Sequence, residues 1–354
     1  MNKLFLGLMS GTSADGLTLA LLDVKAKKII CFKNYSYPQK LQKEILQAPF
    51  FDTEKIAELN FKLGKIYLTL TQKFLKDFNI NKKEISAIGL HGQTVYHNGE
   101  IPCTLQIGEA AFLAKKIGIT VINNFRPSAI ALGGQGAPLV PIFENYFFAE
   151  KMPKILLNIG GISNASYVQK NKTFGFDCGP GNVLSDYAIS KLSKGKKSFD
   201  KEGKIADENK ADIKKAKEIA KNFLYKKIIS LDRNAFTETF FEKYFPCLTQ
   251  RDLATLNYLT ALIIAQNIKK FILKKYSVNE LYISGGGAYN KTLVNNLKNL
   301  LPELKIKFLS SINPIAKEAA CIAYLAYLAW QRSPVNKSLL GTKKDTILGV
   351  LNLP

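Results

Sequence analysis

The sequence predicts an α/β protein with two similar halves and a cleft between them. Two stretches, "GLMSGTSADGLTLALLD" (7–23) and "LLNIGGISNASYV" (156–168), both read as a strand, a glycine-containing turn and a returning strand. Each stretch opens a part of the chain in which three strands are followed by helices. Hydrophobic residues make up 47% of the chain, which is enough to fill the cores of two such halves.

In the first half, the hydrophobic periodicity predicts a sheet and one long helix. Strands are expected at Leu4–Met9, Leu17–Val24, Ile29–Tyr35, Ile85–Leu90 and Ile119–Asn123. Helical spacing over Thr53–Phe78 predicts the long helix, and a shorter one in "IGEAAFLAKKIG" should end at Gly118. The stretch "FRPSAIALGGQGAPLVP" (125–141) is rich in glycine and proline, and we expect no regular element there.

The second half repeats this order. Strands are expected at 155–159, in "ASYVQK" (165–170), in "TFGFD" (173–177) and in "ELYIS" (280–284). Helices are expected at about 209–225, 254–275 and 315–330, the last of them rich in alanine and suited to close packing. We expect a first lobe of residues 1–128 with 335–354, and a second lobe of residues 129–334.

Composition excludes several classes of function. The net charge is +22, but only four of the 50 basic residues are arginine, the residue suited to bidentate phosphate and base contacts. The dispersed lysines favour a solvated surface, so we expect no nucleic-acid partner. No apolar run reaches the ~18 residues of a membrane span, and "MNKLFLGLMS" is too short for a signal peptide. We therefore expect a cytoplasmic protein without a membrane partner.

The cysteines and histidines do not indicate a metal site or a disulfide framework. The five cysteines are scattered without a CxxC pair, which argues against a zinc ribbon and against a disulfide framework. His91 and His97 are the only histidines, so a histidine-rich metal site is not expected.

Three glycine-containing turns are candidates for phosphate or nucleotide binding. Residues Ser10, Gly11, Thr12 and Ser13 offer hydroxyls and backbone N–H groups close together, as phosphate oxygens require. "NIGGISN" offers the same from the other half, and "SGGGAYN" (284–290) exposes backbone to a flat ligand such as adenine. None matches a P-loop or a dinucleotide fingerprint. Each turn alone also fits a purely structural role; the pair, one per half, favours a phosphate chain held between lobes.

A few charged residues stand where chemistry is plausible. Asp177 ends a predicted strand in "FDCGPGN", and Asp15 lies inside the first loop; either could serve as a base or a metal-side ligand, or could be a turn or capping residue. His91 in "HGQTVYH" is either structural or ligand-binding. Arg126 is a candidate anion anchor, and Glu318 either binds ligand or complements the helix dipole.

These motifs, in this order, resemble the anhydro-N-acetylmuramic acid kinases. The resemblance runs through nearly the whole chain: "GLMSGTSADG", "HGQTVYH", "TLQIGEAAFLA", "FRPSAIALGGQGAPLVP", "NIGGISN", "FDCGPGN", "SLDRNAF", "ATLNYLTA", "SGGGAYN" and "EAACIAYLA". "GGQGAPLVP" and "FDCGPGN" are the most specific. The resemblance implies two RNase H-like lobes of the sugar kinase, Hsp70 and actin superfamily with a central cleft.

The resemblance also implies a reaction. ATP, with Mg²⁺ bridging its phosphates, would phosphorylate the 6-oxygen of 1,6-anhydro-N-acetylmuramic acid while water opens the anhydro ring, in peptidoglycan recycling. Asp177 would be the base that activates water. His91, Arg126 and Glu318 would line the sugar side, and Asp15 is a candidate metal-side carboxylate. The family's habit suggests a homodimer.

The resemblance places nucleotide contacts in both halves. The implied ATP- and phosphate-binding residues are Ser10, Gly11, Thr12, Ser13, Asp15, Gly16, Asn158, Gly160, Gly161, Gly179, Gly181, Gly285, Gly286 and Gly287.

The chain departs from the family pattern at several positions. Thr18 stands where an acidic residue is usual, Asn124 replaces an aspartate close to Arg126, and "IISLDRN" lacks the usual Pro-Lys. Two alternatives stay open: a kinase of a related amino sugar, and a nucleotide-switched binding protein of the same fold. The retained Asp177 favours an enzyme, because a switch needs no base.

Overall fold

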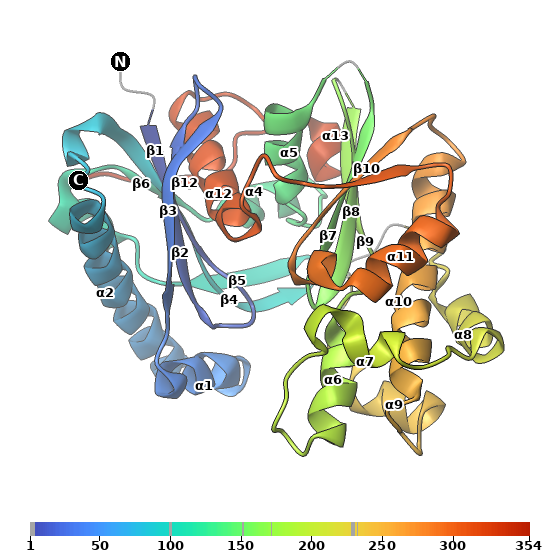
Figure 1. Ribbon diagram of the computed structural model, residues 1–354. Helices are drawn as coiled ribbons and strands as arrows, with labels where there is room; N and C mark the ends of the chain where they lie inside the picture. Colours follow the sequence, from blue (N-terminus) through green and yellow to red (C-terminus); the bar gives the residue numbers. More distant parts are fainter. Residues whose placement is uncertain (1–3, 99–100, 151, 171, 228–230, 232) are drawn as a thin grey trace. The chain divides into compact units, whose positions relative to one another are not determined.

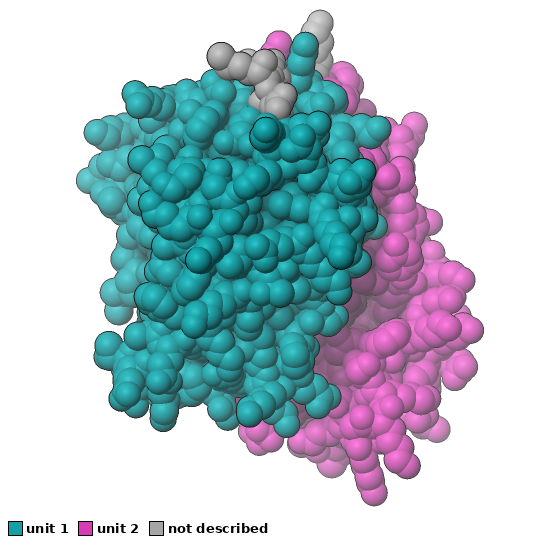
Figure 2. All heavy atoms as spheres, turned by 90° about the vertical axis from the view of Figure 1, so that its left-hand side faces the viewer, with its two compact units in different colours: residues 1–147, 312–354 teal, residues 148–311 magenta. Residues whose placement is uncertain are grey.

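The computed structural model describes residues 4–98, 101–150, 152–170, 172–227, 231 and 233–354 of the chain (Figure 1). The chain divides into two compact units, one of residues 1–147 with 312–354 and the other of residues 148–311 (Figure 2). No helix among the described residues is long and apolar enough to cross a membrane.

Unit 1 (1–147 and 312–354) is built on a seven-stranded mixed sheet with the order β12-β6-β4-β1-β2-β3, and β5 pairs with β4 at its side. The strands are β1 (Leu4–Ser10), β2 (Gly16–Asp23), β3 (Lys28–Ser36), β4 (Ile85–Asn98), β5 (Cys103–Ile107), β6 (Val121–Asn123) and β12 (Val350–Asn352). The first three form an antiparallel meander, whereas β4 runs parallel to β1 and to β6. The carboxyl end of β1 therefore lies beside β4.

The helices of unit 1 are α1 (Gln39–Gln47), α2 (Thr53–Asp77), α3 (Ala111–Leu113), α4 (Phe125–Ile130), α5 (Val140–Phe148), α12 (Pro314–Trp330) and α13 (Lys337–Leu340). Short 3-10 turns stand at η1 (Ala48–Phe50) and η2 (Lys82–Glu84), and α3 continues into a π-helical turn at η3 (Ala114–Gly118).

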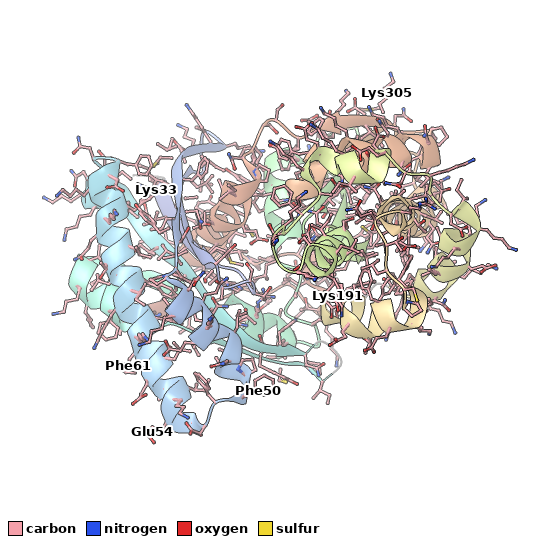
Figure 3. All side chains as sticks on the ribbon, turned by 60° about the horizontal axis from the view of Figure 1, so that its bottom comes forward. Lys33, Phe50, Glu54, Phe61, Lys191 and Lys305 are labelled. Atoms are coloured by element: carbon pink, nitrogen blue, oxygen red, sulfur yellow. The ribbon has the colours of Figure 1, made fainter. Side chains whose placement is uncertain are left out.

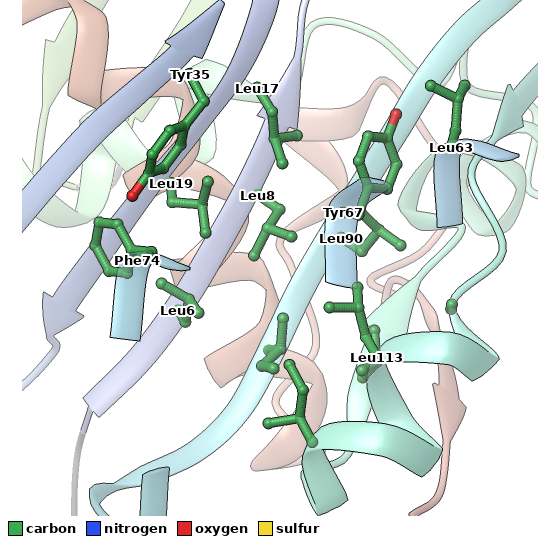
Figure 4. Close-up of a cluster of buried hydrophobic side chains, with 14 of the residues drawn as sticks. Leu6, Leu8, Leu17, Leu19, Tyr35, Leu63, Tyr67, Phe74, Leu90 and Leu113 are labelled. Atoms are coloured by element: carbon green, nitrogen blue, oxygen red, sulfur yellow. The ribbon is translucent and has the colours of Figure 1, made fainter. Parts of the chain in front are cut away.

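Helix α2 covers one side of the unit 1 sheet. Its side chains at Leu63, Tyr67 and Phe74 are fully buried against leucines of β1 and β2 (Figure 4). The Asp52 carboxylate begins the helix by accepting the Lys55 N–H at 2.9 Å. Burial of three large side chains from one helix face is what fixes this long helix on the sheet.

Helix α12 packs so closely on the sheet that two strand positions require glycine. A Cβ on Gly7 of β1 would lie 1.9 Å from the Ala319 carbonyl oxygen, and one on Gly89 of β4 would lie 2.4 Å from the Ile322 carbonyl oxygen. Gly7 and Gly89 are direct partners across the two parallel strands. The expected close packing of the alanine-rich helix is confirmed.

Unit 2 (148–311) repeats the strand order of unit 1. Its sheet runs β11-β10-β7-β8-β9, with β7 (Lys154–Ile159), β8 (Ile162–Gln169), β9 (Lys172–Pro180), β10 (Glu280–Ser284) and β11 (Lys305–Phe308). Again the first three strands form an antiparallel meander and the next two are parallel to the first. When the hairpin strand β5 and the edge strand β12 of unit 1 are set aside, both units have the order third, second, first, fourth, fifth, which confirms the expected pair of RNase H-like sheets.

The helices of unit 2 are α6 (Val183–Leu192), α7 (Lys204–Asp207), α8 (Ile213–Ala220), α9 (Glu238–Tyr244), α10 (Asp252–Ile268) and α11 (Lys291–Leu300). Shorter turns are η4 (Lys201–Gly203), η5 (Lys221–Phe223), η6 (Arg233–Phe236), η7 (Lys269–Leu273), a π-helical turn that continues α10, and η8 (Gly286–Tyr289). Most of α10 is buried between two hydrophobic clusters, one against the sheet and one against α6, α8 and α9.

Three expectations need correction. The strand expected at Ile85–Leu90 continues through "HGQT" to Asn98, because it pairs with β5 as a hairpin. The stretch 125–141 contains α4, whose Pro127 stands in the first turn, where a missing N–H costs nothing. The units divide near 147 and 312 instead of 128 and 334, because α12 packs on β1, β2 and β4.

Candidate active site

The loop Ser10–Gly16 of unit 1 is held from below by a buried hydrogen-bond network. The Ser10 hydroxyl accepts a hydrogen bond from the Tyr37 phenol O–H at 3.1 Å. It donates to the side-chain oxygen Oε1 of Gln93 at 2.6 Å. The Gln93 amide in turn donates to the Gly11 carbonyl oxygen at 3.1 Å. Ser10, expected to contact phosphate, is 1% exposed. Its hydroxyl therefore anchors the loop.

Three of the remaining residues of the loop face solvent, whereas Ala14 and Gly16 are buried. Thr12, Ser13 and Asp15 are exposed, and a Cβ on Gly11 would meet nothing closer than the Ser13 hydroxyl at 3.8 Å. Ala14 turns the chain with a φ of +50°, and its N–H closes the turn on the Gly11 carbonyl oxygen at 3.0 Å. Two hydroxyls, a carboxylate and open backbone at Gly11 thus stand free for a ligand. Gly16 is different: its Cβ would clash with the Tyr35 carbonyl oxygen at 2.5 Å.

His91, Arg126 and Glu318 come together in unit 1, as expected. His91 lies on β4, Arg126 in the first turn of α4 and Glu318 in the first turns of α12. The Arg126 Nε donates to His91 Nε2 at 3.1 Å, with Nη2 at 3.0 Å from the same atom, and Nη1 donates to the Gly136 carbonyl oxygen at 2.9 Å. The glycine-rich stretch therefore fixes the guanidinium.

The contacts of His91 show what it does. Its Nδ1 lies 2.9 Å from the Gly92 carbonyl oxygen, so Nδ1 carries the proton and Nε2 accepts from Arg126. Burial, followed by the neighbouring guanidinium, lowers the His91 pKa to about 3, so the ring is neutral. Both ring nitrogens are occupied, which makes His91 a support for Arg126 and leaves no nitrogen of this ring for a ligand.

Arg126 retains binding capacity. Of its five N–H groups, the three contacts above leave one on each terminal nitrogen without a partner among the described residues. Two such donors on one guanidinium suit a carboxylate. Burial lowers the Arg126 pKa and Glu318 opposes that effect.

Glu318 contributes a carboxyl beside Arg126. Its side chain keeps contact with solvent, while the surrounding protein raises its pKa by removing part of its hydration. Lys317 and Arg126 lower the pKa again, and the charge of Asp15 raises it. Glu318 is therefore close enough to Arg126 and to Asp15 for their charges to influence its carboxyl.

In unit 2, two glycine turns are bonded to each other. The Gly160 carbonyl oxygen accepts the Asn182 N–H at 2.7 Å, and the Gly161 carbonyl oxygen accepts the Gly181 N–H at 2.8 Å. The turn after β7 and the turn after β9 thus form one backbone platform at the amino end of α6.

The glycines of unit 2 divide into two kinds. Among the glycines expected to contact nucleotide, a Cβ would come within 3.0 Å of other atoms at Gly179, Gly181, Gly285 and Gly287, so close packing requires glycine there. A Cβ on Gly160 would meet nothing closer than 3.5 Å, and one on Gly286 would meet only the Asn182 amide at 3.3 Å. Gly160 of "NIGGISN" and Gly286 of "SGGGAYN" therefore have space beside their backbone for a ligand.

The carboxyl ends of β7 and β10 are joined by a side-chain hydrogen bond. The Ser284 hydroxyl of β10 donates to the Asn158 side-chain oxygen of β7 at 3.3 Å, next to their backbone pairing. Asn158, expected to contact nucleotide, therefore has at least one bond inside the protein.

Asp177 stands on β9 beside a break in the strand pairing. Asn164 pairs with Asp177, but the preceding Ser163 pairs with Gly179, so Cys178 is an extra residue. Such a β-bulge redirects the neighbouring side chain. Asp177 is half-buried, and its Oδ2 accepts the Leu231 N–H at 2.8 Å. Residues 228–230 and 232 of "IISLDRN" lie outside the described residues.

A pocket of about 1210 Å³ lies within unit 2 next to these turns. It is lined by α6, η4, η8 and α11, and Asn182 and Gly286 connect it to the glycine platform. The aromatic side chains Phe199 and Tyr289 line it although they are 59% and 68% exposed. An open pocket with two accessible rings suits a flat heteroaromatic base.

The structure adds residues that sequence reasoning missed. Gln93 and Tyr37 hold the first loop, and a signal for Gln93 existed in "HGQT". Lys317 and Glu144 form an ion pair at 3.0 Å with both side chains almost fully buried. No local sequence pattern indicates this pair, because its partners are 173 positions apart.

Metal ligands are sparse. No group of three or more His, Cys, Asp or Glu side chains that could hold a metal occurs among the described residues. Mg²⁺ on a nucleotide needs only one or two protein carboxylates, with phosphates and water supplying the rest. The exposed carboxylate of Asp15, beside the loop hydroxyls, fits that requirement.

Comparison with known proteins identifies the family. The model of the anhydro-N-acetylmuramic acid kinase family matches residues 3–353. The chain belongs to this family. Similar anhydro-N-acetylmuramic acid kinases include one from Caldanaerobacter subterraneus subsp. tengcongensis, 36% identical over 99% of this chain and 97% of that protein. The kinase from Hydrogenovibrio crunogenus is 33% identical over 99% of this chain and 98% of that protein. The kinase from Bacillus cereus strain B4264 is 35% identical over 98% of this chain and 96% of that protein.

Two departures from the anhydro-N-acetylmuramic acid kinase pattern have local explanations. The Thr18 hydroxyl donates to the Asn34 side chain across β2 and β3 at 3.0 Å. Asn124 has a φ of +53°, a conformation that asparagine tolerates, and its side chain caps nothing. Since His91 and Gly136 hold Arg126, its orientation does not depend on the lost charge at 124.

Proposed function

We propose that this chain is an ATP-dependent kinase that opens the ring of 1,6-anhydro-N-acetylmuramic acid and phosphorylates its 6-oxygen, in peptidoglycan recycling. The observation that carries the proposal is the placement of Asp177 at a bulged strand end beside a glycine platform, in a member of this family. Cell-wall turnover sugars and ATP meet in the cytoplasm, where we expect the enzyme to act. A homodimer stays an expectation from the family.

In the proposed reaction, Asp177 takes a proton from water as the water oxygen attacks the anomeric carbon. The bond from that carbon to the bridging 6-oxygen breaks, and the 6-oxygen bonds to the γ-phosphorus of ATP while the bond to the β-phosphate breaks. The products are N-acetylmuramic acid 6-phosphate and ADP. The bond from the Leu231 N–H stabilises the ionised carboxylate, which is the form a base needs.

The nucleotide is proposed to bind unit 2 through its base. The base would enter the pocket between Phe199 and Tyr289, with the Gly286 backbone beside it. The phosphates would extend from the base along the open backbone at Gly160. Bound Mg²⁺ would neutralise phosphate charge, with Asp15 as the protein carboxylate available to it.

The sugar is proposed to be recognised by its lactyl carboxylate. The two free N–H groups of Arg126 would bind both carboxylate oxygens, while His91 and Gly136 hold the guanidinium in place. This contact explains why a neutral buried histidine accompanies the arginine.

Isotope labelling tests the chemistry. Purified protein with ATP, Mg²⁺ and anhydro-N-acetylmuramic acid in ¹⁸O-water should give ADP and a 6-phosphate with label at the anomeric carbon and none in the phosphate ester. Authentic N-acetylmuramic acid 6-phosphate in the same water gives the rate of exchange by ring opening, so samples are taken before exchange is significant. An unlabelled anomeric oxygen would refute water attack.

Replacing the base tests Asp177 itself. Asp177→Asn should reduce kcat by about 10³-fold or more while ADP binds within about twofold of wild type, since the amide keeps the shape but accepts no proton. Loss of ADP binding would assign Asp177 to nucleotide or metal contact. Turnover of an amino sugar with a free 6-hydroxyl by Asp177→Asn would favour a kinase of a related sugar.

A further inference from the structure

The bulge leaves Cys178, which is fully buried, without a partner residue in the pairing of β8 with β9. A buried carbonyl without a partner would be costly. Its partner is the side-chain amide of Asn267 on α10, whose Nδ2 donates to the Cys178 carbonyl oxygen at 3.2 Å. Asn267 is fully buried.

Asn267 also holds the segment that returns to Asp177. Its Nδ2 lies 2.8 Å from the Phe223 carbonyl oxygen, and its Oδ1 accepts the Tyr225 N–H at 3.2 Å. Farther along the same segment, the Leu231 N–H donates to Asp177. One side chain thus joins the strand that carries Asp177 to residues 223 and 225.

We propose that Asn267 is a positioning residue for Asp177: its amide binds the Cys178 carbonyl and so stabilises the bulge that directs the carboxylate. The inference rests on the proposed function, in which Asp177 activates water. Asn267 touches neither substrate nor reacting atoms; it acts through the backbone at Cys178.

Purely structural roles explain the geometry less well. On the interior of α10, an asparagine that only stabilised the helix could bond to the preceding turn, and Asn267 does lie 3.0 Å from the Ile263 carbonyl oxygen. However, its amide also reaches β9 and the 223–225 segment, which no local interaction requires. A leucine would fill the same space without leaving donors to satisfy.

Two substitutions separate the roles. Asn267→Leu removes the hydrogen bonds to β9, to residues 223 and 225, and to the preceding turn of α10. Asn267→Thr keeps a bond to the preceding turn, as the buried Thr71 hydroxyl does with the Tyr67 carbonyl oxygen at 2.7 Å, but it is too short to reach β9. Ile272→Ala is the matched control, because Ile272 is fully buried in the hydrophobic cluster on the unit 2 sheet, in the π-helical turn that continues α10.

The measurements are kcat, KM for both substrates, the affinity for ADP and thermal stability. Both Asn267 variants should lose about 100-fold in kcat, with KM and ADP affinity within about threefold of wild type, because small displacements of a catalytic group affect chemistry more than binding. Ile272→Ala should lose stability but keep its kcat at temperatures where it is folded. If Asn267→Leu does not fold, Asn267→Thr carries the test.

Wild-type kcat in a folded Asn267→Thr would overturn the inference, as would an equal loss of kcat in Ile272→Ala at matched stability. Asp177→Asn, measured alongside, keeps the two proposals apart. If Asp177→Asn retains turnover, the proposed function fails; if only Asp177→Asn is inactive, the role of Asn267 fails and the function stands.

Discussion

At the scale of single residues, Arg126 shows how a site can be prepared for an anion. Its guanidinium is half-buried and fixed at two points, by His91 and by the Gly136 carbonyl. The free donors are already oriented, so less conformational entropy is lost when a carboxylate binds.

Arg126→Lys should raise KM for the sugar about 10- to 100-fold, with a smaller effect on kcat, because an ammonium group cannot bond to His91, Gly136 and a carboxylate together. Steady-state kinetics with varied sugar measure this. Arg251→Lys, at an exposed arginine, is the control and should match wild type. An unchanged KM in Arg126→Lys would exclude the proposed carboxylate contact.

His91 should make stability depend on pH. Its pKa is about 3 in the folded protein and near 6.5 when unfolded, so the unfolded chain binds the extra proton. Stability is therefore complete above pH 6.5 and falls as the pH drops toward 3, by about 2 kcal/mol at pH 5. Urea unfolding at pH 7.5 and 5 should show a smaller loss in His91→Asn than in wild type. Equal losses would mean that His91 is not buried as a neutral ring.

At the scale of elements, α12 depends on two different contacts. The paired glycines of β1 and β4 let its backbone approach the sheet, and the buried Lys317–Glu144 ion pair joins it to α5. Ring stacking of Tyr324 on Tyr146, with centroids 4.0 Å apart, adds to the second contact. The helix that carries Glu318 is thus held on both sides.

Removing one partner of the ion pair should be much worse than removing both. Glu144→Gln leaves the Lys317 charge buried and should cost about 3–5 kcal/mol of unfolding free energy. The double variant Glu144→Gln, Lys317→Met should recover most of this loss, since one Glu144 oxygen already lacks a partner among the described residues. Urea denaturation measures both. A double variant as unstable as the single one would contradict this account.

At the scale of the whole molecule, charge is spread over the surface. The labelled lysines Lys33, Lys191 and Lys305 lie on three different elements, β3, α6 and β11 (Figure 3). Several form exposed ion pairs, for example Lys33 with Asp77 at 2.7 Å. Exposed pairs of this kind add little stability. The charge is thus mainly a property of the solvated surface.

A dispersed lysine surface should attract polyanions only weakly. Fluorescence anisotropy with labelled single-stranded RNA and double-stranded DNA should show binding at 20 mM salt that disappears by about 150 mM, because screening removes diffuse attraction. ATP turnover should persist at the higher salt. Saturable binding of either nucleic acid at 150 mM would contradict the expectation of no nucleic-acid partner.

Local patterns predicted the sheets well and the site unevenly. The three-strand openings and the long helix over 53–78 followed from hydrophobic periodicity, because each buries one face. Sequence reasoning missed α4 in the stretch 125–141. The low helix propensity of proline and glycine argued against a helix there, although Pro127 lies in the first turn, where proline is tolerated. Glycine motifs marked the turns, but only packing distances separate Gly160 and Gly286 from the glycines that the backbone requires.

The sequence by itself determined the repeated α/β halves, the family and the identity of Asp177 as the candidate base. These depend on periodicity and on motifs, which are local along the chain. Only the tertiary structure decided that Ser10 anchors its loop, that His91 supports Arg126, and that Asn267 joins the bulge beside Asp177 to a distant segment. The physical reason is that hydrogen-bond partners of buried groups are chosen by the folded backbone, across separations that no local pattern records.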